Sequence, residues 1–171
     1  RLFRYPNVGP LSDDEAIKAL QTPVLEQNVS FTEESLLELI RITRGYPYFL
    51  QEWGYNTWNL APHTPIDIDV VVSATGVVIR KLDESFFRVR FDRLTPREKD
   101  YLRALADLGS GPHRSGDIAD RLRMRVQSLS PLRYGLIRKG MIYSPAHGDT
   151  AFTVPLFDEF MIRTMPDWNR K

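Results

Sequence analysis

The sequence contains no cysteine, which excludes a disulfide framework, a thiolate metal site and a cysteine nucleophile. It also has no run of about eighteen apolar residues, the length that a membrane-spanning helix needs, and no signal-like segment at its start. We therefore expect no membrane partner. Because missing cysteines are compatible with a reducing compartment, we expect a cytoplasmic location. The first residue is Arg1 rather than Met, which suggests a piece of a longer protein.

The residue types that hydrolytic enzymes need are missing or scattered. No Gly-Lys-Ser or Gly-Lys-Thr triplet occurs, although a loop that cradles nucleotide phosphates needs glycine-rich backbone and a lysine. His63, His113 and His147 lie too far apart to suggest a metal site, and no nucleophile-elbow motif is present. We therefore expect this chain by itself to be no enzyme, with no catalytic residues, no metal and no cofactor.

The residues that are present divide unevenly between the two halves of the chain. The apolar fraction of 42% is ordinary for a globular protein, so a core can form. Residues 1–87 have 7 Lys and Arg against 12 Asp and Glu, a net charge of −5, whereas residues 88–171 have 16 against 10, a net charge of +6. This asymmetry suggests two domains, of which the second is the candidate for an anionic partner. Scatter in surface charge would also produce it.

The first half has the pattern of four helices with short connections, a small bundle. Ser12–Glu15 is a capping box that begins a short helix, which we expect to end before Pro23. The next two helices are predicted over Thr32–Gly45, where the glycine ends the helix, and over Pro47–Ala61, where the proline begins it. A longer helix is predicted over Asp67–Val89, although a strand remains possible because part of this stretch is rich in β-branched residues.

The second half predicts three helices followed by a hairpin. A capping box at Thr95–Glu98 begins the first helix, and Ser115 is expected to cap the second. The third is predicted over roughly Val126–Lys139, and if its cap lies near Gln127, Pro131 falls among the first four residues, whose N–H groups need no partner. The remaining elements are two strands and a closing helix, at Met141–Ser144, Ala151–Val154 and Leu156–Met165. This order is that of a winged helix, a helix-turn-helix variant, so we expect a mainly α chain with a helical bundle at 1–90 and a winged-helix domain with a C-terminal helix at 91–171.

Several stretches together resemble the C-terminal region of bacterial AAA-family ATPases of the STAND or archaeal-ATPase type, distant relatives of replication initiators. These stretches are Gly45–Gly54, Leu82–Phe87, Gly111–Ala119, Leu136–Pro145 and Phe152–Phe157. The resemblance implies that residues 1–90 are a lid domain and that a nucleotide-binding domain lies upstream, as the partner of this region. It also implies that the parent protein is an ATPase with ATP or ADP and magnesium as its cofactors.

The turn Gly45–Tyr46–Pro47 is the sharpest candidate site. In the family that the sequence resembles, the Gly-x-Pro turn of the lid approaches the adenine. Glycine allows close backbone approach, proline fixes the turn, and a helix N-terminus offers N–H groups. The alternative is a plain turn between helices. Replication-type relatives often have an arginine after this proline, where Tyr48 stands here, so we expect the lid to read the base rather than the phosphates.

Aromatic residues are concentrated just after this turn. They could form a stacking platform, but we favour a core together with an interface to the upstream nucleotide-binding domain. The residues are Tyr46, Tyr48, Phe49, Trp53, Tyr55 and Trp58.

A set of basic and polar residues predicts double-stranded DNA as the partner of the second half. A recognition helix in the major groove needs Arg, Lys, Gln or Asn side chains, and such residues lie on or beside the second and third predicted helices, with His147 at the hairpin tip. The predicted DNA-contact residues are Arg114, Arg121, Arg123, Arg125, Gln127, Ser128, Arg133, Tyr134, Arg138, Lys139 and His147.

Acidic residues oppose this interpretation. Asp117 and Asp120 dilute the positive charge, and Asp149 lies at the hairpin tip, where a strong DNA binder usually has Arg or Lys. A module that binds a partner protein, or that inhibits the parent protein by packing on its nucleotide-binding domain, therefore remains the alternative hypothesis.

Overall fold

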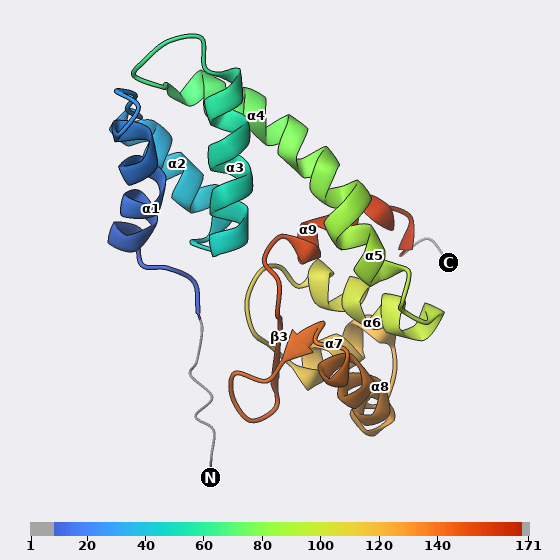
Figure 1. The fold of residues 1–171 in the computed structure, drawn as a ribbon. Coiled ribbons are helices and arrows are strands. Elements are labelled where there is room, and N and C mark those ends of the chain that lie inside the picture. The colour runs from blue at the N-terminus through green and yellow to red at the C-terminus, as the bar shows by residue number, and fades with distance from the viewer. Residues whose placement is uncertain (1–8, 169–171) are drawn as a thin grey trace, which may run out of the picture. The chain divides into compact units, whose positions relative to one another are not determined.

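A computed structural model describes residues 9–168, so that residues 1–8 and 169–171 of the two predicted domains lie outside the described residues. The chain divides into two compact units, residues 1–81 and 82–171. Both are built mainly from helices, and the second also contains a small three-stranded sheet (Figure 1). The boundary predicted from the sequence, between residues 90 and 91, falls inside a helix of the second unit. Across residues 9–168, no helix combines the length and the apolar character that a membrane crossing requires.

The first unit contains the helices that the sequence predicts, and the fourth segment is a helix rather than a strand. The predicted capping box is confirmed, because the Ser12 N–H donates to Glu15 Oε2 at 2.9 Å and the Glu15 N–H donates to Ser12 Oγ at 3.4 Å. The helices are α1 (Asp13–Leu25), α2 (Glu33–Thr43), α3 (Pro47–Leu60) and α4 (Ile68–Lys81).

The predicted end of the first helix is wrong, because α1 continues through Pro23 to Leu25. A proline inside a helix costs about 3 kcal/mol, because it removes one backbone donor and its ring crowds the carbonyl four residues earlier. The continued helix buries Val24, which is 9% exposed, next to Leu20 at 6%. Burial of a valine side chain contributes about 2 kcal/mol, which offsets most of that cost.

The core of the first unit is organised around α3, against which α1, α2 and α4 all pack (Figure 1). Phe49, Leu50 and Trp53 of α3 are at most 2% exposed. The Trp53 indole N–H donates to Thr75 Oγ1 of α4 at 2.9 Å, so that its one polar atom is satisfied inside the core.

The second unit has the predicted order of three helices, a hairpin and a closing helix, together with elements that the sequence did not predict. Its elements are η1 (Leu82–Phe87), α5 (Arg88–Phe91), α6 (Pro96–Asp107), β1 (His113–Arg114), α7 (Ser115–Leu122), α8 (Val126–Arg138), β2 (Ile142–Tyr143), β3 (Asp149–Phe152) and α9 (Phe157–Thr164).

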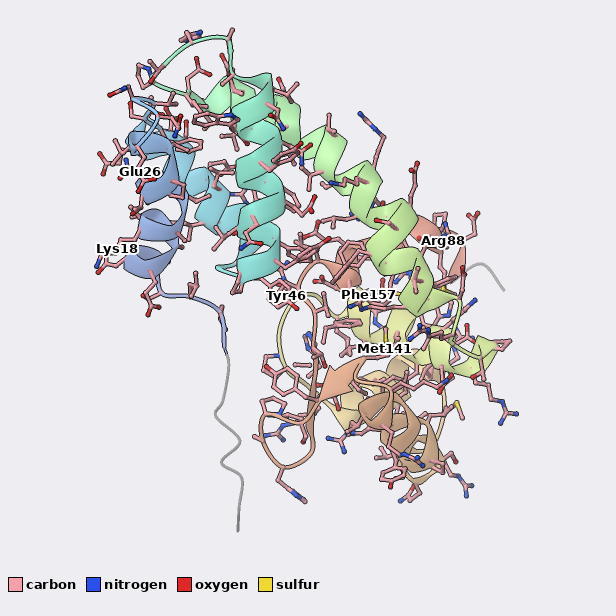
Figure 2. All side chains as sticks on the ribbon, in the orientation of Figure 1. Lys18, Glu26, Tyr46, Arg88, Met141 and Phe157 are labelled. Atoms are coloured by element: carbon pink, nitrogen blue, oxygen red, sulfur yellow. The ribbon has the colours of Figure 1, made fainter. Side chains whose placement is uncertain are left out.

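The helical run that begins with α4 changes type at η1, which is a π-helix. The sequence predicts helix over Asp67–Val89 but not this change, because a π-helix depends on what its side chains contact. Arg163 of α9 holds the Asp83 carboxylate through two hydrogen bonds of 3.0 and 2.7 Å. The Phe87 ring packs against both Phe157 and Phe160 of α9, with centroid distances of 5.7 and 5.3 Å (Phe157 is labelled in Figure 2).

The sheet is antiparallel throughout, with the strand order β1-β3-β2. In the hairpin, Ile142 pairs with Phe152 and Tyr143 with Ala151. β1 adds a third strand through the pairing of His113 with Thr150. A strand of two residues has no periodicity of its own, so the sequence could not predict it.

Two helix starts in the second unit differ from the prediction. Arg114, not Ser115, is the N-cap residue of α7, and the Ser115 hydroxyl instead donates to the Gly148 carbonyl at 3.0 Å. Ser115 therefore ties α7 to the hairpin. The N-cap of α8 is Arg125, which places Pro131 inside the helix rather than in its first turn. Pro131 is exposed, so its missing donor costs no buried hydrogen bond.

Glu98 joins the start of α6 to the end of α8. Its carboxylate accepts hydrogen bonds from the Thr95 N–H at 2.8 Å, which confirms the second capping box, and from Lys139 Nζ at 2.7 Å. Lys139 also donates to the Arg93 carbonyl at 3.1 Å. Burial raises the pKa of Glu98, but the hydrogen bonds from Lys139 and Thr95 outweigh it, so the pKa lies below its ordinary value.

Replacement of Glu98 by Gln tests this junction. We expect the free energy of unfolding at pH 7 to fall by about 1–3 kcal/mol, because the variant loses a charge-assisted hydrogen bond in a buried place. Folding lowers the Glu98 pKa, so the carboxylate stabilises the protein above its ordinary value of 4.5 and loses this effect as the pH falls through the folded-state pKa.

Urea unfolding at a series of pH values measures the difference in the free energy of unfolding between the unsubstituted chain and Glu98→Gln. It should shrink as the pH falls below 4.5, whereas Glu34→Gln, an exposed matched variant in the first turn of α2, should change little at any pH. A Glu98→Gln deficit that stays constant from pH 7 to acidic pH would contradict the assignment.

Candidate functional site

The predicted nucleotide-contacting turn joins α2 to α3 in the first unit. Arg44 and Gly45 both have positive φ, of 53° and 67°, which reverses the chain after α2. Gly45 is needed for space as well, because a Cβ atom there would lie 2.5 Å from the Leu11 backbone oxygen. The Leu11 N–H donates to the Gly45 carbonyl at 2.9 Å. The backbone ahead of α1 therefore lies directly against this turn.

Tyr46 and Pro47 form the start of α3 (Tyr46 is labelled in Figure 2). Tyr46 is the N-cap residue and makes no side-chain capping hydrogen bond, while Pro47 is the first helical residue. The Tyr46 ring packs on Phe49 at 4.9 Å between centroids, and Pro47 and Tyr48 are exposed. These side chains are rings without charge, and the exposed Arg44 lies beside them in the same turn.

The aromatic residues after the turn divide between core and surface. Phe49 and Trp53 are fully buried, whereas Tyr48 and Tyr55 are 40% and 64% exposed. Beside Pro47, between α1 and α3, an apolar pocket of about 350 Å³ is lined by residues that include Leu11, Pro47, Tyr55 and Trp58. The sequence did not predict this pocket, because most of its walls come from two helices that are distant in sequence.

Arg121, Arg133 and Lys139, three of the predicted DNA-contact residues, are engaged in contacts within the second unit. Lys139 holds Glu98 as described above, and Arg121 forms an ion pair of 3.1 Å with Asp107 of α6. Arg133 donates to Thr150 Oγ1 and to the Asp149 carbonyl, each at 2.9 Å. These cations therefore hold the helices and the hairpin together.

Arg133 belongs to a buried polar cluster under the hairpin. Its partner Thr150 is fully buried, as is the phenol of Tyr101 from α6. Burial raises the pKa of Tyr101 above its ordinary value, and Thr150 and the Arg133 charge only partly oppose this effect. Tyr101 therefore stays neutral at physiological pH, and the cluster is a packing element of α6, α8 and β3.

The other predicted DNA-contact residues are exposed. Arg123 and Arg125 lie in the turn between α7 and α8, and Arg138 lies at the far end of α8 with its guanidinium 5.9 Å from the Tyr134 ring centroid. Within the described residues, Arg114, Arg123 and Arg125 have no ion-pair partner. These other residues are Arg114, Arg123, Arg125, Gln127, Ser128, Tyr134, Arg138 and His147, and Arg121 and Lys139 are exposed as well despite their ion pairs.

The same region has exposed residues that were not predicted to contact DNA. Met124 and Val126 flank Arg125 and are 40% and 44% exposed, and Pro131 lies on the exposed side of α8. An apolar residue at a helix start looks like core in sequence, so only the packing reveals its exposure. Within residues 9–168, no three His, Asp or Glu side chains lie close enough to share a metal ion.

Comparison with known proteins finds a similar fold in a solved structure. A family model described as a domain of unknown function, DUF8462, matches residues 84–161, and no curated protein matches the chain. The Walker-type ATPase of Pyrococcus abyssi has a similar structure, with a TM-score of 0.63 and 22% identity over 89% of this chain and 42% of that one. The RuvB Holliday junction branch migration motor of Thermotoga maritima aligns with a TM-score of 0.42 and 14% identity, over 84% of this chain and 47% of that one. The chain thus spans less than half the length of these structures.

Gly45→Ala tests the geometry of the turn. The variant would place a side chain at φ 67° and 2.5 Å from the Leu11 carbonyl oxygen, so we expect a loss of more than about 1 kcal/mol in the stability of the first unit. Gly76→Ala is the matched control, since Gly76 lies inside α4 with its nearest neighbour at 3.8 Å. We expect it to stabilise the unit by about 0.5–1 kcal/mol. Thermal unfolding compares the two, and an equal effect of both substitutions would contradict the geometry.

Proposed function

We propose that this chain is the C-terminal region of a AAA/STAND-type ATPase, in which the first unit is a helical lid and the second is a winged-helix domain that binds double-stranded DNA. In the parent protein, an upstream domain binds ATP or ADP with magnesium. The lid closes over the nucleotide, and its state controls DNA binding by the winged helix. The phosphate chemistry belongs to the upstream domain, so the chain by itself hydrolyses no nucleotide.

The Gly45–Tyr46–Pro47 turn supports the lid assignment. A tyrosine ring and an exposed proline at the start of α3 present uncharged surface, next to a left-handed glycine that is buried against the Leu11 backbone. Such a surface suits the face of an adenine base. Within this proposal, Gly45, Tyr46 and Pro47 contact the base, and the phosphates lie against the upstream domain.

One observation carries the DNA-binding proposal: the exposed cations and polar side chains gather around the N-terminal end of α8. Arg123 and Arg125 precede the helix, while Gln127 and Ser128 occupy its first turn. Helix-turn-helix proteins contact base edges with the N-terminal residues of the second helix and phosphates with the residues around it. Arg114 belongs to β1, whose backbone is in register with Asp149 of β3, so β1 supplies a further cation directly ahead of α7.

A second candidate function is protein interaction or autoinhibition, and the apolar pocket between α1 and α3 favours it. Exposed apolar surfaces of this kind mark binding sites for apolar groups. In that case, the partner is the nucleotide-binding domain or a separate protein. Pull-down of the chain with the isolated nucleotide-binding domain, with and without ATP, tests this function. No binding under either condition would count against it.

Fluorescence anisotropy with a 20-bp duplex at about 50 and 200 mM KCl tests DNA binding, since each phosphate contact steepens the loss of affinity with salt. We expect Arg125→Ala to weaken binding to all sequences and to lower the salt slope by about 1. Arg80→Ala, which removes an exposed arginine from α4 of the first unit, is the matched control. It should change neither the affinity for DNA nor the salt slope. The absence of salt-dependent binding at micromolar protein would end the DNA-binding proposal.

Phosphate release from ATP tests the proposal that the upstream domain, and not this chain, hydrolyses the nucleotide. With the 171-residue chain, ATP and magnesium, we expect no release above the buffer rate, because the sequence has no phosphate-binding loop. Turnover that scales with protein concentration, and that survives further purification, would overturn the assignment of chemistry to an upstream domain.

A further inference from the structure

Four exposed side chains line up along one face of α8. Gln127, Pro131, Tyr134 and Arg138 follow one another at spacings of four, three and four residues, which places them on one face of a helix. All of them are exposed, and Tyr134 is 65% exposed. The opposite face, which includes Leu129 and Leu136, is buried.

This outward face has no cation over most of its length. Between Val126 and Ile137 the only Lys or Arg is Arg133, and its guanidinium is held by Thr150 and the Asp149 carbonyl. Guanine presents two acceptors, N7 and O6, in the major groove, and the side chains that bind both are Arg and Lys. The body of α8 therefore lacks the group that reads guanine.

Gln127 supplies the complementary chemistry. A glutamine amide both donates and accepts, which matches the acceptor N7 and the donor N6 of adenine, whereas an arginine only donates. One turn further on, Pro131 and Tyr134 present apolar surface, which suits contact with the methyl group of thymine. We infer that α8 selects A·T base pairs, and that Gln127 is the residue that reads adenine. This inference rests on the proposed DNA binding.

The exposed arginines take a different role. Arg125 lies at the N-cap, outside the helix body, and Arg138 lies at the far end beside Tyr134. At the two ends of a helix in the major groove, these positions face the flanking phosphates, which carry no sequence information. Arginine contacts therefore set the affinity for all sequences, and Gln127 sets the preference among them.

The test uses the 171-residue chain and a library of 20-bp duplexes with a randomised centre. We expect the selected duplexes to be A·T-rich at the centre and to bind about tenfold more tightly than G·C-centred ones. Replacing the central adenines by 7-deaza-2′-deoxyadenosine, which lacks N7, should weaken binding of the unmodified chain about tenfold. Gln127→Ala should lose most of the preference, apart from the contribution of Pro131 and Tyr134 to thymine contact, and should show no further loss with the modified base. Gln127→Arg should shift the preference toward guanine.

Gln27→Ala removes an exposed glutamine after α1 and is the matched control, with no expected change in preference. Salt-dependent binding without A·T preference would overturn the inference alone, as would an equal effect of the modified base on the original chain and on Gln127→Ala. A guanine preference that Arg125→Ala abolishes would also overturn it, since Arg125 would then be the reading residue. Failure to bind any duplex would remove the DNA-binding proposal together with the inference.

Discussion

The hydrogen-bonded ion pair between Glu98 and Lys139 is the interaction on which the second unit depends most. Lys139 follows the last residue of α8, and Glu98 belongs to the capping box at the start of α6, so one contact joins two helix termini. The carboxylate serves two purposes, because it also accepts the Thr95 N–H that α6 leaves without a partner in the helix. The position of α8 is thereby linked to the most strongly signalled helix start in the sequence.

The basic residues of the second unit divide according to their neighbours. Arg133 and Lys139 are bound to buried or part-buried oxygen atoms of β3 and α6, and removal of either would leave polar groups unsatisfied. Arg123 and Arg125 extend into solvent from a turn. A count of positive charge treats these residues alike, although only the second kind is available to a polyanion. Charge asymmetry between the two halves of the sequence is thus a weaker guide to binding than the contacts of each cation.

Local signals in the sequence predict much of the fold. Both capping boxes, the proline at the start of α3 and the hairpin depend on residues a few positions apart, and the structure has each of them. The departures depend on distant contacts. The extension of α1 past Pro23 places Val24 in the core, and the π-helix lies where Asp83 and Phe87 contact α9. For the candidate site, residue type predicts which side chains could bind an anion, but the inward orientation of Arg133 requires the position of Thr150, which lies on β3.

The hydrogen bond from Leu11 to Gly45 has a mechanical consequence for the first unit. It connects the backbone just ahead of α1 directly to the turn between α2 and α3, since neither Leu11 nor Gly45 belongs to a helix. A force applied to the chain at residue 10 would therefore act on the hydrogen bond to the Gly45 carbonyl before it acts on the side-chain contacts of α1. That carbonyl belongs to Gly45, the left-handed residue next to Tyr46. Tension in the backbone segment ahead of α1 would therefore act first on the start of α3.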